Sequence, residues 1–136
     1  ELHGVLRTAH GTVELAAGDS DDNDIVMLAP IPSNAAVPSL FIGSDSLGGS
    51  CTFNVGIYKT DGTVKDEDVF ATLVADGAAM TDVRFEAANI DTAGQKMYEL
   101  AGDTTDPGGY YYIAATMSAA GGTAGTMSWN ITYVVN

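Results

Sequence analysis

The chain has 136 residues and a mass of 14.0 kDa, the size of one ordinary domain. Hydrophobic residues make up 46% of the sequence and charged residues 17%, which excludes a disordered tail. The 18 Asp and Glu residues outnumber the 5 Lys and Arg residues, and the net charge is −13. Because a partner rich in phosphate needs clustered cations, we expect neither nucleic acid nor an anionic membrane as a partner.

The first sixteen residues hold two short apolar stretches, Val5-Leu6 and Val13–Leu15, on either side of Gly11. This segment has little charge and no evident hairpin partner, so two interpretations stay open. It is either the first strand of the domain's own sheet or an arm, residues 1–16, that pairs with the edge of an adjacent subunit. In the second case Leu2, Val5 and Leu6 lie in an interface. Deleting residues 1–16 would in that case abolish binding to the adjacent subunit and leave the rest of the domain folded.

An acidic loop follows this segment. Asp19, Asp21 and Asn23 have the one-three-five spacing of the oxygen ligands in calcium loops. Such loops need Gly at the sixth position and Glu at the twelfth, where this sequence has Asp24 and Pro30. A solvated turn of carboxylates is therefore the favoured interpretation, and a surface cation held by Asp19, Asp21 and Asn23 is the alternative.

Turn-forming residues recur about every ten positions along the rest of the chain, the spacing typical of an all-β sandwich or barrel. Besides the first segment, the alternation of apolar and polar residues predicts strands at residues 25–28, 40–42, 51–58, 81–87, 96–100, 110–117 and 126–135. In the strand at 81–87, Val83 and Phe85 are expected to point inward.

Two segments depart from this pattern of strands. Residues 30–39 contain Pro30, Pro32 and Pro38, which predict an extended loop. Residues 66–73 begin with three acidic residues and place Val69, Phe70 and Leu73 at helical spacing, which predicts a helix of about two turns between the sheets. The sequence thus predicts one domain over residues 1–136: an all-β, jelly-roll-like single β-sandwich of about eight strands with one short helix.

The strand at 110–117 carries aromatic residues on both faces, with Tyr110 and Tyr112 opposite Tyr111 and Ile113. Because a strand of a sandwich has only one core face, a loop or a neighbouring subunit must cover the second face. Tyr is enriched in interfaces, so Tyr110 and Tyr112 are candidate interface residues. In the alternative interpretation their rings lie over the edge of the sandwich with the hydroxyl groups in water.

The sequence offers little for catalysis. The only histidines, His3 and His10, lie seven residues apart without a third zinc ligand, and no serine stands in a Gly-x-Ser-x-Gly elbow. The single Cys51 excludes an intramolecular disulfide, and its alternation with Phe53 predicts a buried, inert thiol. Nearly all carboxylates lie in predicted turns. We therefore expect that the protein is not an enzyme and that it binds no cofactor.

Two stretches of the sequence resemble small virion proteins of tailed bacteriophages. Residues 51–72, CTFNVGIYKTDGTVKDEDVFAT, resemble a pattern in which an "NVGLY" strand leads through "DG" into an acidic "D-x-D-x-F-A" segment. Residues 112–127, YIAATMSAAGGTAGTM, are similar to the ending of those proteins, an apolar strand and an Ala/Thr/Gly turn before a last strand that closes on "Y-V". The resemblance lies in strand and turn residues and covers about the C-terminal two-thirds of the chain.

The resemblance implies a non-enzymatic protein that decorates or cements the mature capsid. Such proteins commonly bind the lattice of the major capsid protein as trimers, which places them in the virion on the capsid exterior. The acidic loops would then face solvent. Two alternatives stay open. One is a glycan-binding tail or fibre module, which needs an aromatic platform beside polar groups, and the other is a structural subunit of another extracellular assembly.

Overall fold

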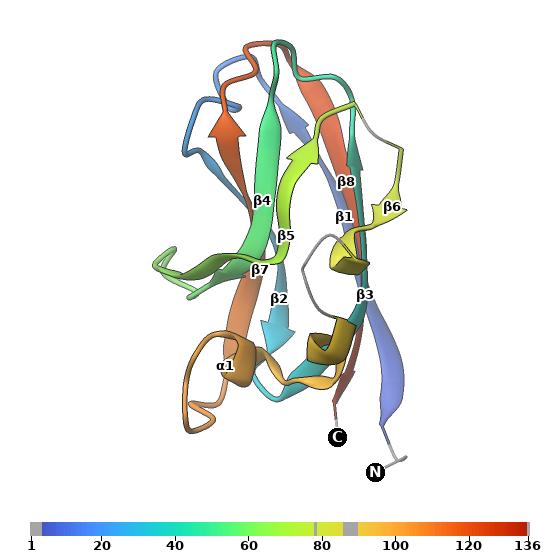
Figure 1. Ribbon diagram of the computed structural model, residues 1–136, viewed down its shortest axis with the longest axis vertical. Helices are drawn as coiled ribbons and strands as arrows, with labels where there is room; N and C mark the ends of the chain where they lie inside the picture. Colours follow the sequence, from blue (N-terminus) through green and yellow to red (C-terminus); the bar gives the residue numbers. More distant parts are fainter. Residues whose placement is uncertain (1–3, 78, 86–89, 136) are drawn as a thin grey trace.

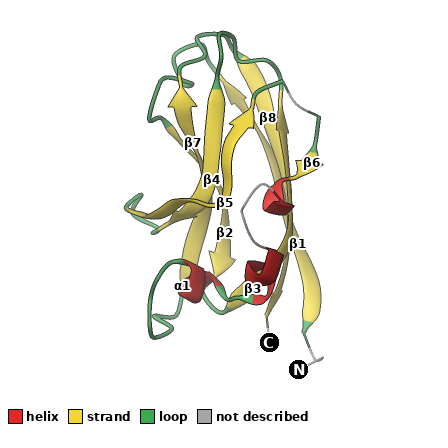
Figure 2. Ribbon diagram, viewed as in Figure 1, coloured by secondary structure: helices red, strands yellow, loops and turns green. Residues whose placement is uncertain are grey.

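The computed structural model describes residues 4–77, 79–85 and 90–135. These residues form eight strands, which build two layers (Figures 1 and 2). The strands are β1 (Val5–Leu15), β2 (Ile25–Pro32), β3 (Ala35–Ser44), β4 (Thr52–Tyr58), β5 (Val64–Ala75), β6 (Thr81–Asp82), β7 (Tyr110–Ala119) and β8 (Gly125–Val135). Between β6 and β7 lie two 3-10 turns, Val83–Phe85 and Ile90–Gly94, and the one-turn helix α1 (Met97–Leu100).

The strand order is that of a jelly roll. One sheet has the order β1-β8-β3-β6 and the other β2-β7-β4-β5. The first strand pairs antiparallel with the last, the second with the seventh, the third with the sixth and the fourth with the fifth. This nested pairing arises when one long antiparallel hairpin is rolled into two packed sheets. The predicted all-β, jelly-roll-like sandwich is therefore confirmed.

The core lies between the inner faces of the two sheets. Phe53, Val55 and Ile57 on β4 are fully buried, as their alternation predicts, and Cys51 just before that strand is 1% exposed. Burial of one such apolar side chain stabilises the fold by about 1.5–3 kcal/mol. No helix among the described residues is long and apolar enough to cross a membrane.

The predicted helix at residues 66–73 is wrong, because these residues belong to β5. The spacing of the apolar residues misleads here because β5 contains bulges. Its pairing with β4 shifts register three times, and Leu73 adopts a positive φ of 54°. Each extra residue changes which side chain points inward, so Phe70, Ala71 and Val74 are buried at a spacing that looks helical.

The predicted loop at residues 30–39 is also wrong. Pro30 and Pro32 end β2, and Pro38 lies within β3. An edge strand tolerates proline where its backbone N–H would point away from the sheet, and β2 is such an edge. Pro38 is accommodated because the pairing of β3 with β8 shifts register between Ala36 and Ser39.

Two predicted strands are largely replaced by turns. Residues 97–100 form α1, where Met97 and Leu100 are buried three positions apart, and only Lys96 makes an isolated bridge to Ala36. The predicted strand at 81–87 is confirmed only at Thr81–Asp82, after which the chain enters a 3-10 turn. Residues 86 and 87 lie outside the described residues.

The N-terminal segment is a strand of the domain's own sheet. β1 pairs with β8 without interruption from Val5 opposite Val135 to Leu15 opposite Gly125. The pairing requires glycine at position 11, because a Cβ there would lie 2.6 Å from the Trp129 ring, closer than van der Waals contact allows. Since Leu15 at the end of β1 is also buried, residues 5–15 are part of the sandwich itself.

Candidate interface

The two ends of the sandwich differ in charge. One end, which we call the acidic end, is formed by the loops at residues 16–24, 45–51, 76–80 and 120–124 and lies at the top of Figure 1. These four segments contain no Lys, Arg or His. They contain the six acidic residues Asp19, Asp21, Asp22, Asp24, Asp45 and Asp76.

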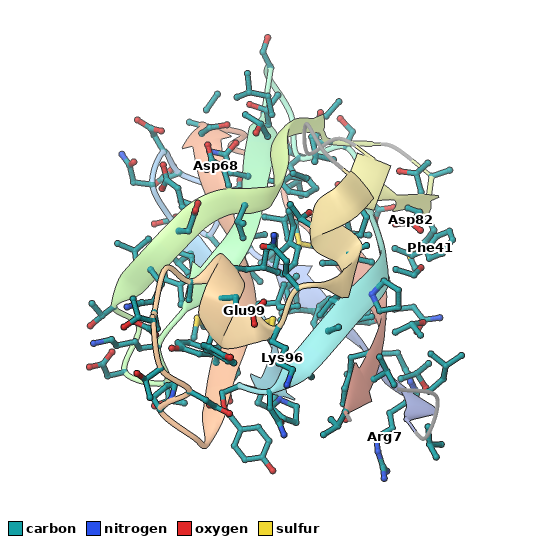
Figure 3. All side chains as sticks on the ribbon, turned by 60° about the horizontal axis from the view of Figure 1, so that its bottom comes forward. Arg7, Phe41, Asp68, Asp82, Lys96 and Glu99 are labelled. Atoms are coloured by element: carbon teal, nitrogen blue, oxygen red, sulfur yellow. The ribbon has the colours of Figure 1, made fainter. Side chains whose placement is uncertain are left out.

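The opposite end, which we call the termini end, carries the start of β1, the start of β7 and the end of β8, whereas the hairpin at residues 59–63 projects from the side of the sandwich (Figure 1). Figure 3 shows Arg7 and Lys96 on the face of this end that is turned forward, and Lys65 is bonded to Asp103 in the loop between α1 and β7. Carboxylates are present here too, so this end has mixed charge. Every Lys and Arg of the chain therefore lies outside the loops of the acidic end.

The structure brings the two predicted interface features to the termini end. Val5 is 65% exposed, Leu6 is 67% exposed and Tyr110 is 59% exposed. Tyr112 is half-buried. Leu2 lies outside the described residues. The two features belong to different sheets, since β1 is in one layer and β7 in the other.

Part of the second face of β7 is covered by the chain itself. Beside β7, the backbone of β5 crosses β4 so closely that a Cβ on Gly56 would lie 2.1 Å from the carbonyl oxygen of Asp66. Under this crossing Tyr58 is buried, and its hydroxyl group shares a hydrogen bond with that of Thr116. β5 therefore covers part of the second face of β7, whereas Tyr110 remains exposed.

A pocket of about 430 Å³ lies beside Tyr110. The hairpin between β4 and β5 supplies one wall, and the loop between α1 and β7 supplies the other. Its polar wall is organised by Asp103, which accepts a hydrogen bond from Lys65 at 2.8 Å and another from the hydroxyl group of Tyr111. Sequence reasoning missed this cluster, because its members are far apart in the chain.

The contacts of Asp103 change the acidity of the group and of its neighbour. The hydrogen bonds from Lys65 and Tyr111 stabilise the carboxylate and hold the pKa of Asp103 below its ordinary value. Burial, together with the nearby carboxylate, raises the pKa of Tyr111 to about 12. Asp103 is therefore an anion and Tyr111 a neutral donor at every physiological pH.

One of the candidate cation ligands, Asp19, has a hydrogen-bond partner within its own loop. Asp19 accepts a hydrogen bond from the backbone N–H of Ala16 at 2.8 Å, and the backbone N–H of Asp21 donates to the carboxylate of Asp24 at 2.9 Å. Asn23 adopts a positive φ of 71°. Among the described residues, no group of three or more His, Cys, Asp or Glu side chains is placed to hold a metal ion.

Arg84 was missed by the sequence reasoning, which pointed its neighbours Val83 and Phe85 inward. Arg84 is 1% exposed, and Val83 is buried as well. The guanidinium donates to the carbonyl oxygen of Val37 at 2.9 Å and to Thr92 at 3.1 Å, and it lies 4.9 Å from the centre of the Phe70 ring. Burial lowers the pKa of Arg84. Its place in the 3-10 turn, which breaks strand alternation, is what turns this side chain inward.

No protein-family model matches the chain, and no curated protein matches it either. The chain is similar to one in the cyanophage Pam1 capsid asymmetric unit, with 11% identity and a TM-score of 0.53 over 100% of this chain and 89% of that one. It is also similar to a chain in the acidic stable capsid structure of Helicobacter pylori bacteriophage KHP30, with 14% identity and a TM-score of 0.41 over 96% and 94% of the two chains.

At these identities the first similarity shows a shared fold alone, and the second has too low a TM-score to add to it. The chain is therefore a jelly-roll-like β-sandwich. Over its whole length it shares this fold with a chain of a phage capsid structure.

Proposed function

We propose that this chain is a structural protein of a tailed-phage virion. In this proposal it decorates or cements the mature capsid by binding the lattice of the major capsid protein, as a homotrimer on the capsid exterior. The observation that carries the proposal is the fold shared over the full chain with a chain of the cyanophage Pam1 capsid asymmetric unit. The sequence resemblance to small virion proteins supports it independently.

The distribution of charge supports one orientation on the shell. The termini end carries the exposed apolar residues Val5, Leu6 and Tyr110 together with Arg7 and Lys96, whereas every charged side chain of the acidic end is a carboxylate. A surface that contacts protein needs apolar residues with paired charges, and a surface in water tolerates unpaired carboxylates. We therefore assign the termini end to the shell and the acidic end to solvent.

The proposed mechanism is stabilisation by mass action. A protein that binds only the mature lattice lowers the free energy of that state and resists pressure from the packaged genome. Individual contacts can be weak, because a trimer engages several shell subunits at once and its contacts act as one avid attachment. No catalytic group is needed for such a role.

The test is the copy number of this chain in density-purified particles from its source, measured by quantitative mass spectrometry relative to the major shell protein. We expect a ratio near one to one or another simple fraction fixed by icosahedral symmetry. A few copies per particle would move the chain to the tail or fibre. Absence from particles would overturn the virion assignment.

One observation favours glycan binding as a second candidate function. The pocket beside Tyr110 combines an exposed aromatic ring with the ordered polar groups of Asp103 and Lys65. Aromatic faces and fixed hydrogen-bonding groups are what a sugar ring requires. A melting temperature that rises with a host oligosaccharide in the wild type and not in Tyr110→Ala would favour this function, and indifference of both proteins would exclude it for the sugars tested.

A further inference from the structure

The four edges of the two sheets are protected to very different degrees. An unpaired edge offers a row of backbone N–H and C=O groups to any extended chain, and proteins usually block it with short strands, prolines, bulges or charges. β6 is only two residues long. β2 contains Pro30 and Pro32 and a register shift after Met27. β5 is bulged, with Leu73 at positive φ and three successive acidic residues, 66–68.

β1 is not short and has no proline and no bulge, so charge is the one protection left to it. It is eleven residues long, it contains no proline and no residue of positive φ, and its register with β8 is unbroken. Among the described residues, no segment pairs with its outer edge. Its only charged side chains are Arg7 near the start and Glu14 near the end, apart from the histidine at position 10. The edge of β1 is therefore the one edge of the described sandwich that is open to another strand.

A groove lies beside the end of this edge, next to Val13 and Leu15. A space of about 470 Å³ opens between β1 and β2, lined by the apolar side chains of Val13, Leu15, Ile25, Val26 and Met27 and, at its acidic end, by Asp19 and Asp24. Where a strand added beside β1 passes Val13 and Leu15, its side chains on one face would lie over this groove, because side chains alternate between the two faces of a strand. The groove thus specifies apolar residues at the alternate positions of the added segment that face it.

We propose that the edge of β1 binds an extended segment of the shell protein as an additional strand, with its alternate apolar side chains in the groove beside Ile25 and Met27. The charges orient this segment, with a basic residue toward Asp19 and Asp24 and an acidic or neutral residue toward Arg7. This proposal rests on the proposed function, since it takes the shell as the partner. Main-chain hydrogen bonds supply affinity in this mode of recognition, and the groove supplies specificity.

A second copy of this chain fits the edge less well than a single segment does. Pairing of β1 with another β1 is isologous, so it stops at two chains and cannot build a trimer. It would also bring the two β2 edges together, where Pro30 and the bulge block pairing. The other three edges of a second copy are blocked as described above. A single extended segment brings no second sheet with it and meets none of these obstacles.

The first part of the test is hydrogen exchange of the full chain, free and bound to density-purified particles that lack it because its gene has been deleted. We expect exchange of backbone amides in residues 5–15 to slow by about tenfold or more on binding, because only an added strand can bond the outer amides of β1. Amides of β2 and β5 should change little. Binding without protection of β1 would overturn the strand-addition proposal and leave the decoration function standing, whereas no binding at all would count against the function itself.

The second part uses matched pairs of variants on the same particles. Thr8→Lys places a charge on the exposed edge of β1, and Thr72→Lys adds the same charge to the exposed edge of β5. Ile25→Asp places a carboxylate in the groove, and Met80→Asp places one at an equally exposed apolar position outside the groove, in the loop between β5 and β6. Thr8→Lys and Ile25→Asp should lower affinity by about tenfold or more and the controls by less than about twofold, with melting temperatures matched within each pair. Equal losses within a pair would overturn the proposal, as would a β1-paired dimer of the free chain in solution.

Discussion

At the residue scale, close contacts between backbone segments decide which side chain a position can hold. Gly56 is the clearest case, because β5 crosses β4 directly above it. A Cβ at this position would lie 2.1 Å from the carbonyl oxygen of Asp66 and 2.3 Å from the carbonyl carbon of Glu67. Both atoms belong to backbone and cannot swing away. The close crossing buries Tyr58 and positions the acidic stretch of β5 on the surface.

Gly56→Ala is therefore expected to destabilise the sandwich by about 3 kcal/mol or more, since β5 would have to move. The melting temperature should fall by roughly 10 °C. Gly18→Ala is the matched control, because a Cβ on Gly18 meets nothing within 4 Å, and its melting temperature should stay within about 2 °C of the wild type. Equal melting temperatures for the two variants would contradict the crossing of β5 over β4.

At the same scale, Asp103 links the loop before β7 to the start of β5 through Lys65. Its pKa is held below the ordinary value of 3.8 chiefly by the hydrogen bond from Lys65, and also by that from Tyr111. The unfolded chain therefore binds more protons than the folded chain between the two pKa values. This contribution to stability is fully present above the ordinary value and is lost as pH falls through the folded pKa.

Asp103→Asn should accordingly destabilise the protein most at neutral pH, and the effect should shrink as pH falls through the folded-state pKa of Asp103. Urea denaturation at a series of pH values from about 7 to about 2.5 measures the difference in unfolding free energy between wild type and variant. Asp22→Asn, which removes an exposed carboxylate at the acidic end, serves as the control for loss of charge. If the difference between the wild type and Asp103→Asn stays constant across this range, the carboxylate does not act through its ionisation.

At the scale of elements, β1 has two roles that the sequence left as alternatives. It belongs to its own sheet along all eleven residues, and it leaves one edge open. The N-terminal segment is thus neither a free arm nor an ordinary inner strand. Its removal would expose the edge of β8 and uncover buried side chains such as Ile131 and Trp129.

Deletion of residues 1–16 is therefore expected to unfold the domain and not merely to remove an interface. The loss should amount to several kcal/mol, a large share of the roughly 5–15 kcal/mol that typically stabilises a domain. Circular dichroism and thermal denaturation measure it. Deletion of residues 1–4, which ends just before β1, should leave the melting temperature unchanged. A stable, cooperative sandwich without residues 1–16 would restore the detached-arm interpretation.

At the scale of the whole molecule, the charge of −13 opposes the crowding of many copies on one shell. The screening length falls from about 10 Å at 0.1 M salt to about 3 Å at 1 M. Repulsion between the acidic ends of neighbouring copies should weaken accordingly, because these ends carry no cations. Ionic strength is then a regulator of occupancy in the proposed decoration role.

Occupancy on chain-free particles should rise as NaCl is raised from about 20 mM to about 500 mM, when measured at one subsaturating protein concentration. The double variant Asp21→Asn and Asp22→Asn, which removes two carboxylates from the acidic end, should bind better at low salt and show a weaker salt dependence. Occupancy that falls with salt would instead indicate that attraction between the termini end and the shell dominates.

The class of fold and the strongest strands follow from local patterns in the sequence. The alternation of Phe53, Val55 and Ile57 predicted a buried strand, because an apolar residue at every second position is typical of a strand with one face in the core. Turn residues at regular spacing specified a sandwich. The exposure of Val5, Leu6 and Tyr110 was also within reach, because apolar residues on both faces of a segment exceed what one core can bury.

The remaining features depend on contacts between residues that are far apart in the chain. Bulges in β5 give its apolar residues a spacing that resembles that of a helix. The edge position of β2 allows a strand to contain prolines. Asp103, Lys65 and Tyr111 meet because the sheets bring distant loops together. Whether an edge is open depends on which strands are outermost. That order is set by long-range pairing, such as that of the first strand with the last, and local sequence patterns contain no information about it.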